Sequence, residues 1–239
     1  MNKFFTLLSV ELRLSLRGMD MFIFAIVMPV VIAFLIGSMY QDSTILAQSF
    51  GNLSTISICA SGVMGLPLLI ADYRDKKILK RFQVTPSSPL LLLSVWVTIY
   101  IIYSVTSLVL ISFVLVVFFK VSFNGSIIIF LLGYFLVMLS MFSIGLLVGG
   151  VAPNIKIASI WASVLYFPML IFSGATLPFE NLPIFIQKAA NVLPLTQGVK
   201  LLKTLSQEYP NQSSWLPVMI LTIVMIVCGG ISIKLFKWE

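Results

Sequence analysis

The sequence predicts an all-α membrane protein with six transmembrane helices, and three observations lead to this fold class. Hydrophobic residues make up 59% of the 239 residues and charged residues only 10%, whereas soluble domains carry about 25% charged residues. The apolar residues recur in blocks of about 20, the length that a helix needs to cross a bilayer. These blocks follow one another along the whole chain, so we expect a single transmembrane domain over residues 1–239.

Each predicted span is an apolar block without a charged residue in its centre. The spans cover residues 21–40, 50–70, 90–119, 126–150, 157–174 and 215–236. The third block is long enough that it must tilt or extend beyond the hydrocarbon core. The fifth is short, and Pro168 predicts an interruption near its end. Trp215 and Trp238 flank the last span, where indole side chains suit the membrane interface.

The basic residues predict the orientation. Eleven of the 15 Lys and Arg residues lie before the first span, after the second, after the fourth and after the sixth, and four lie in the alternate loops. Cytoplasmic loops carry the excess of Lys and Arg, so both termini are expected in the cytoplasm of a cell with a bacterial-type plasma membrane. Basic clusters beside apolar blocks indicate contact with anionic lipid, and we expect no nucleic-acid partner.

The first residues predict an amphipathic helix lying along the inner membrane surface. A helical wheel places Lys3, Arg13 and Arg17 on one face and an apolar set opposite them, namely Phe4, Phe5, Leu8 and Leu12. Glu11 falls among the apolar residues. Two explanations remain open: an ion pair with a basic residue of the next cytoplasmic loop, or extension of the carboxylate to the lipid headgroups, which we favour slightly.

The loop after the second span predicts a short amphipathic helix over residues 72–82, D-Y-R-D-K-K-I-L-K-R-F. On a wheel the cations share one face: Arg74, Lys76, Lys77, Lys80 and Arg81. Ile78, Leu79 and Phe82 occupy the opposite edge, and Asp72 precedes Lys76 by four residues, a favourable spacing for an ion pair. Two interpretations are equally supported: a helix that docks into a partner's groove, or a solvated basic loop that only fixes topology.

The segment between the fifth and sixth spans is predicted to lie outside and to contain a short helix. Pro178, Pro183 and Pro194 punctuate it, and the apolar run 184–193 between the last two prolines is too short to span a bilayer. A re-entrant or interfacial helix fits this pattern best. Phe185 lies in its apolar run and is expected to help cap a translocation route.

Two absences narrow the function. None of the predicted spans has an ionisable residue in its core, and the chain contains no His, whereas an ion-coupled carrier normally needs such a group inside the membrane. The phosphate-binding pattern G-x-x-x-x-G-K-[ST] does not occur either, so the chain is not expected to hydrolyse ATP. We expect no enzyme activity, metal or cofactor on this chain, and ATP with Mg²⁺ on a separate ATPase if transport is energised.

Three stretches resemble the permeases of the ABC-2 type transporter family. They are K-R-F-Q-V-T-P-S-S-P-L at residues 80–90, P-M-L-I-F-S-G-A-T-L-P-F-E-N-L-P at 168–183 and L-P-L-T at 193–196. The resemblance covers essentially the full chain, and it is the order of the three stretches that is specific. Family motifs usually have Gly-Thr near the middle of the cytoplasmic helix, where this chain has Lys77 and Ile78.

The resemblance implies a pair of six-helix permeases, either two copies or a copy and a paralogue, with two ATPase subunits. The N-terminal segment would be an elbow helix, and residues 72–82 a coupling helix with Asp72, Arg74, Asp75, Ile78, Leu79 and Phe82 as its contacts. Pro178, Pro183, Phe185 and Pro194 would belong to an outer helical hairpin.

The resemblance also implies a substrate route lined by the second and fifth spans. Ser57 and Ser61 lie on one face of the second, and Ser159, Ser163 and Tyr166 on one face of the fifth. Small and hydroxyl residues also serve helix packing, and that alternative stays open. Gly145 and Gly149 in the fourth span are interpreted as packing residues.

These features predict the permease subunit of an ATP-driven exporter that moves an amphipathic or hydrophobic substrate, such as a drug, a peptide or a lipid-linked molecule, out across the plasma membrane. The alternative is an ATP-independent membrane carrier or channel, or a non-transporting membrane protein that assembles complexes. Only the exporter requires a stoichiometric ATPase.

Overall fold

The computed structural model describes residues 3–39, 43–83, 89–121, 123, 125–176, 179, 182–206 and 214–235, and these residues form helices without a strand. The chain begins with α1 (Lys3–Gly18), α2 (Asp20–Phe22), η1 (Ile23–Val27), α3 (Met28–Met39), α4 (Ser43–Cys59), η2 (Ala60–Gly65), α5 (Leu66–Asp75) and α6 (Ile78–Gln83). It continues with α7 (Pro89–Phe113), η3 (Val114–Phe118), α8 (Ile127–Val151), α9 (Ile155–Phe172), α10 (Ile184–Ala190), α11 (Pro194–Leu205) and α12 (Trp215–Leu235). The η elements are wider π-helical turns within longer helices.

Five helices are long and apolar enough to cross a membrane: Ser49–Asp75, Leu91–Phe118, Ile127–Val151, Ile155–Phe172 and Trp215–Leu235. They correspond to the second to sixth predicted spans. The first predicted span corresponds to α2, η1 and α3, and the helix pair Lys3–Gly18 and Ile23–Met39 passes the same test only when taken together across an 80° bend. The chain is therefore a multi-pass membrane protein with five such helices among the described residues, or six if the bent pair is one span.

The helix of the second predicted span continues beyond residue 70, through α5 to Asp75, and the interruption predicted in the fifth span is wrong. The fifth span is not interrupted, because α9 runs through Pro168 to Phe172. A proline is tolerated inside a transmembrane helix because neighbouring groups satisfy the freed backbone carbonyl.

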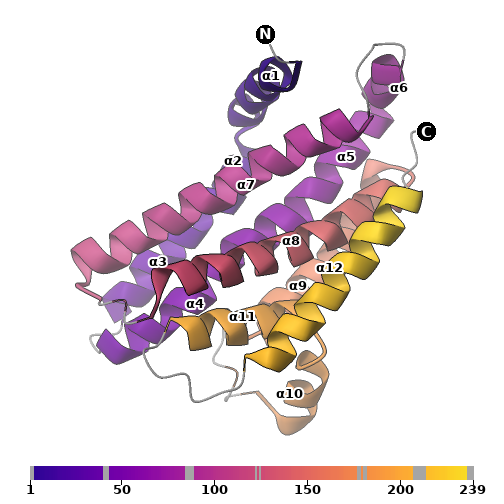
Figure 1. Cartoon of the computed structure of the whole chain (residues 1–239). Coiled ribbons are helices and arrows are strands. Elements are labelled where there is room, and N and C mark those ends of the chain that lie inside the picture. Colours follow the sequence, from indigo (N-terminus) through magenta and orange to yellow (C-terminus); the bar gives the residue numbers. More distant parts are fainter. Residues whose placement is uncertain are drawn as a thin grey trace.

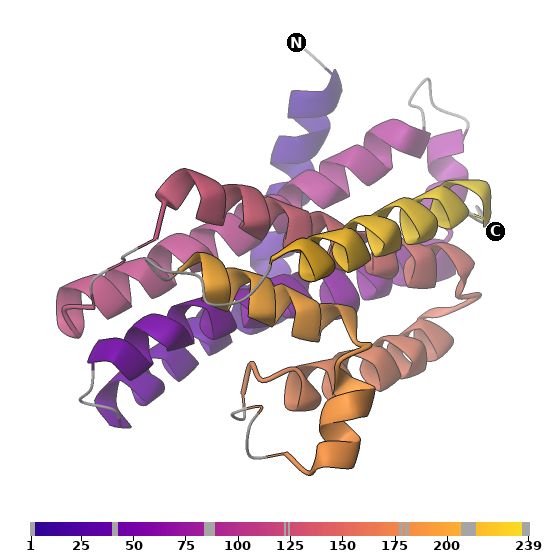
Figure 2. The same cartoon turned by 60° about the horizontal axis from the view of Figure 1, so that its bottom comes forward.

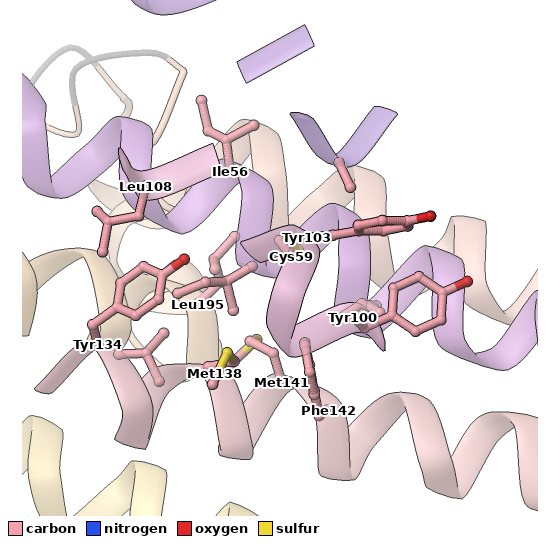
Figure 3. Close-up of a cluster of buried hydrophobic side chains, with 14 of the residues drawn as sticks. Ile56, Cys59, Tyr100, Tyr103, Leu108, Tyr134, Met138, Met141, Phe142 and Leu195 are labelled. Carbon is pink, nitrogen blue, oxygen red and sulfur yellow. The ribbon is translucent and has the colours of Figure 1, made fainter. Parts of the chain in front are cut away.

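The second span forms the centre of the bundle. In its most apolar stretch of 18 residues, 83% of the stretch is buried inside the protein, against 17% in the corresponding stretches of α9 and of α12. Helices α4 and α5 pack against α7, α8 and α9, while α12 lies along α8 and α11 packs against α4, α8 and α12 (Figures 1 and 2). Figure 3 shows part of the buried core, which includes Tyr100 and Tyr103 of α7 and Met141 and Phe142 of α8.

Glycines bring α8 close to the second span. A Cβ atom added at Gly145 would overlap the carbonyl oxygen of Gly62 in η2, and one added at Gly149 would lie 2.8 Å from the Cα atom of Pro67. Small residues at such crossings let membrane helices make close backbone contact. The packing role predicted for Gly145 and Gly149 is confirmed.

The two ends of the bundle separate the segments that the basic residues assign to opposite sides. Helices α1 and α6, the α8–α9 turn and the last turn of α12 lie at one end, which we call the inner end (Figures 1 and 2). The end of α3, the start of α4, η3 and α10 lie at the other, the outer end.

The described part of the segment between α9 and α12, the outer segment, contains the helices α10 and α11. The run 184–193 is helical only to Ala190, because a turn over Asn191 and Val192 intervenes before α11 begins at Pro194. Proline suits the first position of a helix because its missing N–H would have no partner there. Pro183 precedes α10, the Phe185 side chain is 82% exposed, and Pro178 lies outside the described residues.

Candidate functional site at the inner end of α5

The last residues of α5 connect it to three other elements of the inner end. Tyr73, Arg74 and Asp75 bond to α1, to the end of α8 and to the start of α9, while Asp72 pairs locally with Lys76 in the turn after α5. All four belong to the segment that the sequence interprets as a coupling helix.

Tyr73 connects α5 to α1 through Glu11. The Tyr73 hydroxyl donates to Glu11 Oε2 at 2.6 Å, and the indole Nε1 of Trp96 in α7 donates to the same oxygen at 3.3 Å. The two rings also pack edge to face, with centroids 4.8 Å apart. A second bond, from the Tyr103 hydroxyl to Ser15 Oγ at 2.8 Å, fastens α1 to α7.

Both explanations offered for Glu11 are wrong. Its side chain is buried, at 6% exposure, so the carboxylate does not extend to the headgroups. In the described part of the chain its partners are the two neutral donors rather than a basic residue. A buried carboxylate is costly unless hydrogen bonds satisfy it, and each bond to a charged group contributes about 1.5–3 kcal/mol.

Arg74 caps the end of α8. Its side chain is buried, and it donates from Nη1 to the Gly149 oxygen at 2.9 Å and from Nη2 to the Gly150 oxygen at 3.0 Å. Nη1 also donates to the Ala152 oxygen. The last carbonyls of a helix have no partner within the helix and carry its negative dipole end. The end of α8 therefore stabilises the buried guanidinium. The prediction that Arg74 belongs to a solvated basic face is wrong.

Asp75 caps the start of α9. Its Oδ2 atom accepts a hydrogen bond from the Ile155 N–H at 3.0 Å, while the Asn154 side chain accepts from the Ile157 N–H at 2.9 Å. The first N–H groups of a helix lack intrahelical partners, and acidic or amide side chains commonly satisfy them. Asp75 and Asn154 together satisfy two groups of the first turn.

The predicted continuous helix over residues 72–82 is wrong. Helix α5 ends at Asp75, Lys77 adopts a left-handed conformation with φ of +55°, and α6 begins at Ile78. A left-handed residue just past the last turn is a common helix terminator, and glycine adopts it at least cost. Family motifs usually place glycine near this point. The predicted ion pair is confirmed, with Lys76 Nζ 2.7 Å from Asp72 Oδ2.

The break redistributes the predicted coupling residues. Leu79 is fully buried in the chain's own core, so its side chain is not available to a partner, and Ile78 is partly buried against the same core. Lys76, Lys77 and Lys80 are exposed around the turn and α6. The side chain of Phe82 lies outside the described residues.

Most of the other predicted elbow residues follow the expected faces, except that Phe5, predicted on the apolar face, is 64% exposed. Arg13 and Arg17 are exposed, while Phe4 and Leu8 are partly buried against the core.

The residues predicted to line a substrate route come from neighbouring spans, since α9 packs against η2 and α5. Ser57 is buried and donates to the Ala25 oxygen at 2.6 Å, which joins α4 to η1. Ser61 is buried with no partner for its hydroxyl among the described residues. On α9, Ser159, Ser163 and Tyr166 are partly buried.

A polar network that the sequence analysis missed lies in the outer segment. Lys200 of α11 donates to Asn191 Oδ1 and lies 5.1 Å from the centre of the Phe179 ring, and Gln197 Nε2 donates to the Asn191 oxygen at 2.6 Å. Burial lowers the pKa of the Lys200 ammonium group.

Sequence reasoning also missed Tyr73 and Trp96 as partners of Glu11, because they lie 62 and 85 residues away along the chain. The one available signal was Glu11 itself, an acidic residue on an apolar helix face.

Comparison with known proteins identifies the family. The sequence matches the ABC-2 type transporter family over residues 2–205. Nodulation protein J of Rhizobium leguminosarum bv. viciae is 28% identical over 95 residues, which are 40% of this chain and 37% of that protein. Nodulation protein J of Rhizobium leguminosarum bv. trifolii is 32% identical over 68 residues (28% and 26% of the two chains). Nodulation protein J of Sinorhizobium fredii is 26% identical over 95 residues (40% and 36%).

These relatives are matched over well under half of their own length. The family match, in contrast, covers most of this chain and includes every element from α1 to α11. The chain therefore belongs to the ABC-2 type transporter family.

Proposed function

We propose that this chain is the permease subunit of an ATP-driven exporter for an amphipathic or hydrophobic substrate, such as a drug, a peptide or a lipid-linked molecule. The observation that carries the proposal is the inner end of α5, where four neighbouring side chains connect the break before α6 to α1, α8 and α9. A force applied at α6 would reach three other elements through these bonds.

The proposed complex contains two permeases, either identical or paralogous, and two ATPase subunits that bind ATP and Mg²⁺. Exposed lysines at the break and on α6 offer a basic surface for an ATPase. The least buried spans, α9 and α12, expose large apolar side chains such as Val164, Phe167 and Ile226. These surfaces suit lipid or a second permease.

The substrate class follows from what the spans contain. In the described parts of the five candidate spans, charged residues occur only near the ends, as Asp72, Arg74, Asp75, Lys156 and Lys234. A route between α5 and α9 would therefore be apolar with scattered hydroxyl groups, including Ser61, Ser159 and Ser163. Such a wall favours a substrate with a large apolar part.

The remaining features complete the proposed topology. The bent pair of α1 and residues 23–39 would be an elbow helix followed by the first of six spans, with both termini in the cytoplasm of a bacterial-type cell. Helices α10 and α11 would be a re-entrant outer hairpin, because α11 is largely buried although its 12 residues are too few to span a bilayer.

Co-purification tests this function. The chain would be co-expressed with an ABC ATPase encoded beside it, and stable association with hydrolysis that the permease stimulates is the expected result. Inverted vesicles should then accumulate an amphipathic fluorescent dye only when ATP is present. Accumulation without ATP would identify an ATP-independent carrier or channel, and neither association nor accumulation would identify a non-transporting membrane partner.

A further inference from the structure

Two consecutive residues of opposite charge hold the two sides of the α8–α9 turn. Arg74 donates to three carbonyl oxygens at the end of α8, those of Gly149, Gly150 and Ala152. Asp75 accepts from the Ile155 N–H at the start of α9. Each charge matches the dipole of the helix end that it contacts, since cations suit a C-terminus and anions an N-terminus.

The same junction is closely packed beneath these bonds. Ala71 of α5, Ala152 of the turn and Ala158 of α9 are buried together in a small apolar cluster that is separate from the main core. Gly149 allows the end of α8 to approach α5, since an added Cβ atom would lie 2.8 Å from Pro67. Polar bonds and small residues therefore both bind the α8–α9 turn to the end of α5.

The junction lies directly before the break that separates α5 from α6. Arg74 and Asp75 directly precede the break at Lys76 and Lys77, after which α6 begins. Toward the N-terminus, a displacement of α6 reaches the second span through the last turn of α5, against which α6 packs. Whatever is fastened to that turn must move with it.

We propose that Arg74 and Asp75 are positioning residues that fasten α9 to α5, so that the second and fifth spans move as one unit at the inner end when the ATPase displaces α6. The proposal rests on the ATP-driven function proposed above. In this proposal the α8–α9 turn takes part in coupling, because it transmits the motion of α5 to the fifth span.

The first experiment examines the junction without the ATPase. Spin labels replace Lys76 and Lys156, both exposed, in the full chain carrying Cys59→Ala and Cys228→Ala, and the distance between the labels is measured in lipid nanodiscs. One narrow distance is expected in this background, and it should broaden in Asp75→Ala, which removes the bond to α9 but leaves the three Arg74 bonds in place.

Two variants control this experiment. Asp75→Asn should restore the narrow distance, because the amide oxygen can still accept from the Ile155 N–H. Asp72→Ala removes the same charge from the same helix end but no contact with α9, so it should leave the distance unchanged. A narrow distance retained in Asp75→Ala would overturn the proposal.

The second experiment uses the complex with its ATPase, trapped with ATP and vanadate. One label replaces Met39 at the exposed end of α3, and the other replaces either Lys76 or Lys156. In the unaltered complex both distances should change on trapping. In Asp75→Ala the change at Lys76 should be retained and the change at Lys156 should be smaller than in the unaltered complex, and Asp75→Asn should recover the change at Lys156.

The outcomes separate the two proposals. If Lys156 moves in Asp75→Ala as it does in the unaltered complex, the positioning role is wrong although ATP-driven motion is real. If neither distance changes in the unaltered complex, the ATP-driven function is wrong, and with it the coupled movement of the two spans. The first experiment then decides only whether the static junction exists.

Discussion

Replacing Glu11 tests whether the buried carboxylate holds the elbow segment to the bundle. We expect Glu11→Ala to destabilise the protein, because the Tyr73 hydroxyl and the Trp96 indole N–H both lose their acceptor in a buried site. The matched variant Glu11→Gln keeps an amide oxygen that can accept from both donors, so it should retain much of the stability.

The expected magnitude comes from the two donors. A buried donor left without an acceptor costs about 1–3 kcal/mol. The bond from Tyr73 at 2.6 Å is the shorter of the two, and the bond from Trp96 at 3.3 Å lies near the limit of useful length. Removing the carboxylate also removes its desolvation cost, which offsets part of the loss. We expect a net loss of about 2–3 kcal/mol for Glu11→Ala and about 1–2 kcal/mol for Tyr73→Phe.

The assay is reversible unfolding of the purified chain by SDS in mixed micelles, followed by circular dichroism. A double-mutant cycle with Glu11→Ala and Tyr73→Phe should give a coupling free energy of about 1–2 kcal/mol, because the two residues share one hydrogen bond. Strictly additive effects of the two substitutions would show that the bond contributes nothing, and the reasoning would be refuted.

Three further predictions concern the turn at Lys77, the helix crossing at Gly145 and the orientation of the chain in the membrane. Lys77→Gly should stabilise the chain by about 0.5–1 kcal/mol in the SDS assay, because φ is +55° there, and a loss of stability would contradict the left-handed turn. Gly145→Leu should abolish a monodisperse peak in size-exclusion chromatography because its side chain would enter the backbone of η2, whereas Gly230→Ala, with no atom within 4 Å, should behave as the parent chain. In the cysteine-free background, Lys188→Cys should react with an impermeant maleimide added outside intact cells and Lys77→Cys should not; the reverse pattern would invert the topology.

Apolar blocks and turn residues were sufficient to predict most of the helices. Five of the six blocks correspond to helices long enough to cross a membrane, and the short outer helix after Pro183 is present. These features are local, since a helix satisfies its own backbone and needs only a run of apolar residues to be stable in lipid. The ion pair between Asp72 and Lys76 was predictable for the same reason, because both partners lie on one turn of helix.

The errors lie where residues distant along the chain meet. The wheel over residues 72–82 placed Arg74 on a solvated face, because no local pattern shows that the end of α8 presents three free carbonyls beside it. Neither explanation offered for Glu11 included its actual donors, because these lie on α5 and α7, far from α1 along the chain. The break at Lys77 was missed because the residue is not glycine, the residue type that adopts a positive φ most readily.

By itself the sequence determined that this chain is a helical membrane protein without an ATP-binding loop, since composition and block length dictate what can be stable in lipid. The tertiary structure alone decided which charges are buried and what they hold together. Glu11, Arg74 and Asp75 each find a partner on another helix, and only the packing of α1, α8 and α9 around α5 brings those partners within hydrogen-bonding distance.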